Sequence, residues 1–156
     1  MASFYDWSTT ASSNASQGAI NWAEGQAPST VNDSARATLA ALAAWRDLFG
    51  GVKISSGTDT VTLTSGLSLT AYAQGMLFGF EAGGTNTGVV TLNVDSVGAK
   101  AVVKNSDVAL AAGDLKAGGI YLVGYEATND RFQLLTQIGN KASSGASIGL
   151  VLALGG

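Results

Sequence analysis

Residues 29–51 carry hydrophobic side chains at the spacing of an α-helix. The stripe that recurs every three or four positions consists of Val31, Ala35, Leu39, Leu42, Trp45 and Phe49. A helix places all of these side chains on one face. Further alanines lie beside the stripe, and small residues let two helices approach closely.

Short signals mark both ends of this helix. Pro28 fixes the chain at its start, and Thr30 with Asp33 has the spacing of a capping box, with Ser29 as an equally good N-cap. The pair at positions 50 and 51 is Gly-Gly, which supplies the left-handed residue that commonly ends a helix. We expect a helix that begins near Thr30 and is about 19 residues, or roughly 28 Å, long.

From residue 52 to residue 138 the pattern changes to the alternation that is typical of half-buried strands. Strand-like segments fall at 59–64, 66–70, 75–80, 88–94, 101–103, 119–125 and 131–135. Turns rich in Gly, Asn and Asp separate them. The sequence therefore predicts a mainly β protein with one N-terminal α-helix, in which residues 52–138 form a small antiparallel β-sandwich or barrel.

Residues 1–28 show no periodicity and are predicted to form an extended arm. They contain three aromatic residues, Phe4, Tyr5 and Trp7. Exposure of these side chains to water is unfavourable, because each can bury an apolar area of roughly 150 Å² or more. Two interpretations are equally open: the aromatic residues fold back on their own domain, or they anchor the chain on a neighbouring protein. The first residues lack the basic and apolar regions of a signal peptide.

Residues 139–156 are predicted to form a Gly/Ser linker followed by an apolar C-terminal segment. The apolar run at 148–154 is too short to cross a bilayer, which needs about 20 helical residues. A free apolar end of this kind is prone to aggregate. We expect it to be buried in an oligomer or against a partner.

Composition bears on assembly. Charged residues make up 12% of the chain, about half of the usual share of roughly 25%. Either the surface is neutral and polar, or much of it is buried against other subunits, and we favour the second interpretation. The helix leaves the same choice open, because its stripe packs either against copies of itself around a symmetry axis, which we favour, or across its own β domain.

Several functions are made improbable by what the sequence lacks. The net charge is −3 without a basic cluster, which argues against nucleic-acid binding. The chain has no Cys and no His, which excludes disulfides, thiolate metal sites and Ser-His-Asp catalysis. Its acidic residues match no glycosidase or calcium-loop spacing. We expect no enzymatic activity, no cofactor, no metal and no membrane insertion.

The tryptophans are the remaining candidates for ligand binding. Trp7, Trp22 and Trp45 could stack on sugars, but two of them precede the helix and one lies on its stripe. Packing is therefore the favoured role.

The segment at 21–36, Asn-Trp-Ala-Glu-Gly-Gln-Ala-Pro-Ser-Thr-Val-Asn-Asp-Ser-Ala-Arg, closely resembles an opening segment of tailed-bacteriophage tail fibre and related tail proteins. In that family the segment leads into an alanine-rich helix that ends in a Trp-Arg-Asp-like stretch, and this chain has Trp45-Arg46-Asp47 there. The start at 5–10, Tyr-Asp-Trp-Ser-Thr-Thr, is also similar. A looser likeness to the fibre pattern covers 98–135, where Ala101 replaces a frequent proline.

The resemblance implies a non-enzymatic, trimeric virion component that attaches to the tail by its N-terminal part. Such a component is made in the cytoplasm of the bacterial host. The sequence carries one β domain and not the long receptor-binding region of full fibres. A short fibre, a fibre base or a fibre adaptor fits this better than a complete fibre. The expected partners are itself, as a homotrimer, and other phage tail proteins.

Two alternatives remain open. In the first, the β domain would be a carbohydrate-binding module that recognises a host surface glycan or receptor. In the second, the protein would be a head decoration or head fibre protein. In the favoured case the anchoring and interface residues are Phe4, Tyr5, Trp7, Trp22, Val31, Leu39, Leu42, Trp45 and Phe49.

Overall fold

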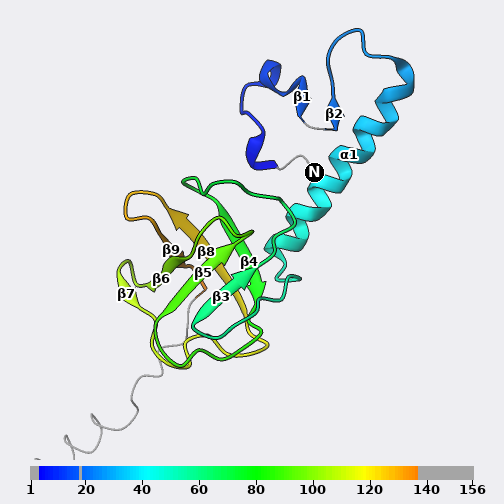
Figure 1. Ribbon diagram of the computed structural model, residues 1–156. Helices are drawn as coiled ribbons and strands as arrows, with labels where there is room; N and C mark the ends of the chain where they lie inside the picture. Colours follow the sequence, from blue (N-terminus) through cyan, green and yellow to red (C-terminus); the bar gives the residue numbers. More distant parts are fainter. Residues whose placement is uncertain (1–3, 18, 137–156) are drawn as a thin grey trace, which may run out of the picture.

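A long helix leads from a short N-terminal segment into a small β-barrel (Figure 1). The computed structural model describes residues 4–17 and 19–136. The elements before the barrel are η1 (Phe4–Asp6), η2 (Ala11–Asn14), β1 (Ser16–Gln17), β2 (Ile20–Asn21) and α1 (Pro28–Phe49). The barrel contains β3 (Thr60–Leu63), β4 (Leu77–Glu81), β5 (Val90–Val94), β6 (Lys100–Lys104), β7 (Val108–Ala109), β8 (Ile120–Glu126) and β9 (Arg131–Leu134). The prediction of a mainly β fold with one N-terminal α-helix is confirmed.

The start of α1 differs from the prediction. The helix begins at Pro28, and its N-cap, Ala27, makes no side-chain hydrogen bond to the first turn. The predicted capping box is therefore wrong. Thr30 already lies inside the first turn, where its hydroxyl donates to the Ala27 carbonyl at 2.8 Å. Asp33 pairs instead with Arg36, at 3.3 Å.

The N-terminal segment has more structure than an extended arm. It contains the two short 3-10 helices and the β1–β2 hairpin, in which Gln17 pairs with Ile20. Ile20 is buried. One serine of α1 joins this hairpin to the helix, because the Ser34 hydroxyl accepts the Asn21 N–H at 3.1 Å and donates to the Asn21 carbonyl at 2.9 Å.

The main sheet has the strand order β3-β5-β6-β9-β8-β4, with β7 paired to β6. Most pairs are antiparallel, as predicted, but β3–β5 and β6–β9 are parallel. The β3–β5 pair is parallel because β4, which lies between them in the sequence, joins the far edge of the sheet. β7 was not predicted. The segment at 66–70 was predicted as a strand and is not one: Ser68 adopts a positive φ of 57°, which breaks the extended conformation.

The two edge strands are joined by the segment at 53–56, directly after the helix. On one side, the Glu81 N–H donates to the Lys53 carbonyl at 2.8 Å and the Ser55 N–H donates to the Glu81 carbonyl at 2.9 Å. On the other side, Ser56 and Thr62 exchange backbone hydrogen bonds of 3.0 and 2.9 Å. This segment closes the sheet into a barrel and removes the exposed edges that would otherwise invite aggregation.

The core fills the inside of this barrel. Its largest fully buried side chains are Phe78, Phe80, Phe132, Leu92 and Leu115, and Leu48 joins the core from the last turn of the helix. The alternation that predicted the strands holds in β5, where Val90, Leu92 and Val94 point inward. The predicted linker and apolar segment at 139–156 lie outside the described residues.

Candidate assembly interface

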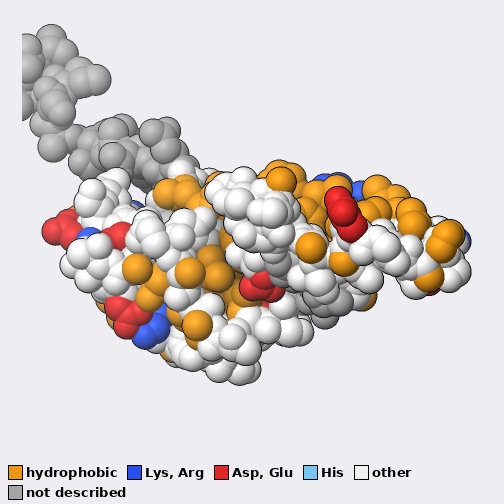
Figure 2. Space-filling view, turned by 90° about the horizontal axis from the view of Figure 1, so that it is seen from above, with side chains coloured by type: hydrophobic (Ala, Val, Ile, Leu, Met, Phe, Trp, Pro, Cys, Tyr) orange, Lys and Arg blue, Asp and Glu red, His pale blue; other side chains and the backbone are white. Residues whose placement is uncertain are grey.

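The helix α1 presents two different faces. Its buried residues, Ser34, Ala41 and Leu48, are spaced by seven and face the rest of the chain. The larger hydrophobic side chains lie on another face, and Val31, Leu42 and Trp45 are exposed although they are apolar. Figure 2 shows hydrophobic side chains gathered along the part of the molecule that the helix forms, whereas charged ones are scattered.

A line of exposed and half-buried side chains along this face has the repeat of a coiled coil. The positions that follow each other at spacings of four and three are Val31, Ala35, Thr38, Leu42, Trp45 and Phe49, which we call the α1 seam. A period of 3.5 residues keeps such positions on one line toward a partner helix. Leu39, which the sequence analysis assigned to the stripe, lies beside the seam and is 67% exposed.

Thr38 is the seam residue that sequence reasoning missed. The hydrophobic pattern favoured its neighbour Leu39, whereas a strict count of four and three residues would have found Thr38. Its hydroxyl donates to the Ser34 carbonyl one turn earlier, at 2.9 Å. Thr38 therefore brings no unpaired donor to the seam, and its methyl group remains for packing.

An aromatic chain connects the N-terminal segment, the helix and the barrel. The ring of Phe4 lies 4.1 Å from that of Tyr5 and 5.7 Å from that of Trp45. Tyr5 continues to Phe78 in the barrel at 6.2 Å, and Trp45 to Phe49 at 5.2 Å. Phe4 and Tyr5 thus pack on their own chain. For these two residues, the interpretation that the aromatic arm folds back on its own domain is the correct one.

Tyr5 also makes polar contacts with the edge of β4. Its hydroxyl donates to the Leu77 carbonyl at 2.6 Å and accepts the Leu77 N–H at 2.7 Å. Burial raises the pKa of the Tyr5 hydroxyl, which favours the protonated form that donates. Tyr5 is therefore a structural residue of the barrel edge.

The other two predicted anchors, Trp7 and Trp22, line a hollow of about 120 Å³ between the N-terminal segment and the helix, together with Asn14, Ile20 and Thr38. Trp22 is 44% exposed. The buried indole N–H of Trp7 has no hydrogen-bond partner among the described residues. Thr38 lies both in this hollow and on the α1 seam, so the two features are continuous.

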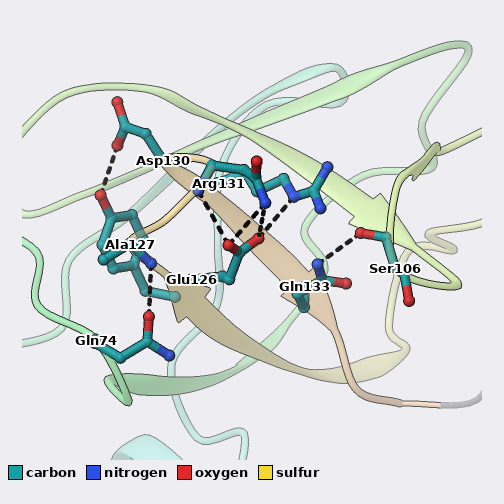
Figure 3. A network of polar contacts seen from close by, with 9 residues as sticks. Gln74, Ser106, Glu126, Ala127, Asp130, Arg131 and Gln133 are labelled. Atoms are coloured by element: carbon teal, nitrogen blue, oxygen red, sulfur yellow. Dashed lines mark hydrogen bonds and ion pairs between the residues drawn. The ribbon is translucent and has the colours of Figure 1, made fainter.

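The acidic residues form local structural contacts. At the β8–β9 hairpin, Glu126 accepts hydrogen bonds from Asn129 and Arg131, and Asp130 accepts one from the Tyr125 hydroxyl (Figure 3). Asp130 also pairs with Lys100. These hydrogen bonds lower the pKa values of Glu126 and Asp130. A carboxyl group held ionised in this way is poorly suited to donate a proton in catalysis.

Among the residues that the structure describes, no three acidic side chains gather in a way that would hold a metal ion. Within residues 4–17 and 19–136, α1 and the shorter helices lack the combination of length and apolarity that a membrane span requires.

In comparisons with known proteins, no family model and no curated protein matches this chain.

Proposed function

We propose that this protein is a non-enzymatic structural component of a tailed-bacteriophage tail: a short tail fibre, a fibre base or a fibre adaptor. The N-terminal segment and α1 assemble and attach the protein, and the barrel projects. The likeness of residues 21–47 to the opening segment of tail fibre proteins supports this setting. The observation that carries the proposal is the exposed α1 seam.

The seam supports self-association through the helix. An adjacent face of the helix is already occupied, since Ser34 holds the β1–β2 hairpin and Leu48 enters the barrel core. On the seam, Val31, Leu42 and Trp45 remain 41%, 43% and 41% exposed, and these side chains are available to a partner helix. Full burial of a Leu or Val side chain is worth roughly 1.5–3 kcal/mol. Burial of the part of each seam side chain that is still exposed would contribute a fraction of this value to association.

The seam also changes in size along its length. Its N-terminal half holds Val31, Ala35 and Thr38, and its C-terminal half holds Leu42, Trp45 and Phe49. Interaxial distance between packed helices follows the size of the side chains in contact. Three parallel helices would thus lie close at their N-terminal ends and separate toward the barrels, which need the space. We propose a homotrimer of this form.

The hollow at Trp7 and Trp22 is the place where we propose that another tail protein docks. It lies at the N-terminal end of the protein and presents an exposed indole, Trp22, beside a half-buried amide, Asn14. Tryptophan is strongly enriched among the residues that dominate protein interfaces.

Light scattering of the purified protein tests the assembly. We expect a mass of three chains at micromolar concentration. Leu42→Glu places a charge in the seam and should give monomers, whereas Ala40→Glu, on the opposite side of the helix, should leave the trimer intact. A wild-type monomer, or equal behaviour of the two variants, would contradict the proposal.

Incorporation into particles tests the attachment. Trp22→Ala should abolish incorporation while the circular dichroism spectrum and the trimer are unchanged. Deletion of residues 1–28 is a poor test because it also removes Tyr5 from the edge of β4. If antibody labelling located this protein at the head of the particle, the protein would be a head decoration protein instead. Glycan binding by the purified protein would favour a role in receptor recognition.

A further inference from the structure

Several large aliphatic side chains lie together on the outer surface of the barrel near β8. Outward positions of β3 and β5 are polar, as in Thr60, Thr62, Thr91 and Asn93, which is usual for a sheet face in water. The outward positions near β8 are instead Ile54, Ile120, Leu122 and Leu135, which we call the β8 outer face. Ile54, Ile120 and Leu135 are 66%, 58% and 50% exposed.

Strand register shows how the residues of the β8 outer face are arranged. Ile120 lies opposite Glu81 on β4, and Glu81 lies opposite Ile54 on the closing segment. In the other direction, the Leu135 N–H donates to the Leu122 carbonyl at 2.8 Å, so these two leucines are neighbours. The aliphatic side chains therefore lie on both sides of Glu81, with Ile54 on the closing segment and Ile120, Leu122 and Leu135 on the side of β8 and β9.

The chain leaves the described residues beside this face. The Thr136 hydroxyl accepts the Leu122 N–H at 2.7 Å, so the described chain ends next to β8, near the end of that strand where Ile120 lies. Residues 137–147 can extend on the order of 36 Å. That length is ample for the chain to turn back over the β8 outer face.

The segment that follows has matching chemistry. Residues 148–154, Ile-Gly-Leu-Val-Leu-Ala-Leu, hold five large aliphatic side chains and no charge. Alternation along an extended chain would place residues 150, 152 and 154 on one side. We propose that residues 148–154 of the same chain cover the β8 outer face. The proposal is independent of the phage setting and of the trimer.

Cysteine cross-linking tests the proposal cleanly, because the chain has no cysteine of its own. We would pair Ile120→Cys with Leu150→Cys or with Leu152→Cys in the full-length protein. The matched control pairs either tail cysteine with Val89→Cys, an equally exposed aliphatic position before β5. Under mild oxidation, the Ile120 pairs should form a disulfide within one chain at least on the order of tenfold faster than the Val89 pairs, because docking raises the local concentration.

The form of the disulfide-linked product shows whether the β8 outer face is covered by the same chain or by another copy. A monomeric cross-linked band on a non-reducing gel, confirmed by peptide mass spectrometry, supports coverage by the same chain. Equal rates for the Ile120 and Val89 pairs would overturn the proposal. Cross-links formed mainly between chains would also overturn it, and would assign the face to another copy.

A second measurement uses the unmodified sequence and does not depend on the variants folding. In methyl-labelled protein, we expect nuclear Overhauser effects between the Ile120 methyl groups and the leucine methyl groups of residues 150–154. Mixing labelled and unlabelled chains separates contacts within one chain from contacts between chains. Absence of these effects in the well-resolved spectrum of the folded protein would overturn the proposal.

Discussion

The hydroxyl of Tyr5 lies between the two backbone polar groups of Leu77, donating to the carbonyl at 2.6 Å and accepting the N–H at 2.7 Å. At Leu77, β8 is the one strand that pairs with β4 among the described residues, and the Tyr5 hydroxyl makes the two hydrogen bonds that a second neighbouring strand would make. Ser34 binds Asn21 in the same way, and Tyr72 accepts the Val94 N–H at 2.8 Å. Hydroxyl groups that satisfy strand backbones are a recurring device in this fold.

Tyr5→Phe should therefore destabilise the protein although every ring contact can remain. The substitution leaves the N–H and the carbonyl of Leu77 without this partner, and an unsatisfied buried polar group costs about 1–3 kcal/mol. Urea denaturation should show a lower midpoint with an unchanged slope. Tyr125→Phe is the control, because the Tyr125 hydroxyl donates to the exposed Asp130 side chain and serves no strand backbone. Equal losses in the two variants would count against the role of Tyr5.

Gly79 is required where the end of the helix lies on β4. A Cβ atom at this position would be 2.5 Å from the Leu48 carbonyl oxygen and 2.9 Å from that of Phe49, and backbone atoms cannot move aside cheaply. Gly79→Ala should cost about 1–3 kcal/mol, as overpacked sites do. Equilibrium denaturation measures this loss.

The control for this prediction is Gly88→Ala. A Cβ atom there would meet nothing within 4 Å, so the substitution should be close to neutral. If Gly79→Ala proves as stable as Gly88→Ala, the helix and the barrel are not held at the distance that the structure describes.

How far the sequence predicts this structure depends on the range of each interaction. The helix and most strands follow from local periodicity, and the inward residues of β5 follow from alternation. The contact between Tyr5 and Leu77 spans 72 residues and leaves no local pattern. The parallel β3–β5 pair is equally hidden, because it depends on β4 joining the opposite edge.

Some residues of the candidate interface can be identified from sequence, and others cannot. Val31, Leu42 and Trp45 were identified from their hydrophobicity and are exposed on the helix. Phe4 and Tyr5 were assigned to the same surface because aromatic residues suit both interfaces and cores, and sequence composition does not separate the two. Thr38 was overlooked because a polar residue at a heptad position is visible only when spacing is weighed above hydrophobicity.

Asn86 joins two loops of the barrel and is buried. Its side-chain amide donates to the carbonyls of Gly88 and Ala111 at 2.6 and 2.8 Å, and its Oδ1 accepts the Leu115 N–H at 2.8 Å. Asn86→Asp removes both donors and turns a carboxylate toward two carbonyl oxygens. We expect a loss of about 3 kcal/mol or more, measured as a fall in the midpoint of thermal unfolding.

Asn93→Asp is the matched control for this substitution. Asn93 Oδ1 accepts the Gly98 N–H at 2.9 Å, and a carboxylate can accept that hydrogen bond equally well. The same chemical change should therefore be tolerated at residue 93. A mild effect at residue 86 would mean that its two donated hydrogen bonds contribute little to stability.

Asp59 makes the stability of the loop after β4 depend on pH. The side-chain hydroxyl of Thr87 donates to Asp59 Oδ2 at 2.6 Å, and the backbone N–H groups of Thr87 and Gly88 donate to Oδ1 at 2.7 and 3.1 Å. These hydrogen bonds lower the pKa of Asp59 in the folded protein, the Thr87 hydroxyl contributing most.

The sign of the effect follows from proton linkage. Because the pKa of Asp59 is lower in the folded chain than in the unfolded one, unfolding takes up a proton at acid pH. The stabilisation is fully present above the unfolded value of about 3.9 and is lost as the pH falls through the folded value. Asp59→Asn cannot ionise and lacks this stabilisation throughout.

The free energy of unfolding of wild type and Asp59→Asn should therefore differ most near neutral pH and converge as the pH falls below about 4. Chemical denaturation at a series of pH values measures the difference directly. Asp107→Asn, at an exposed turn position, corrects for the change in net charge. A difference between wild type and Asp59→Asn that persisted undiminished at acid pH would mean that Asp59 acts through its shape and not through its charge.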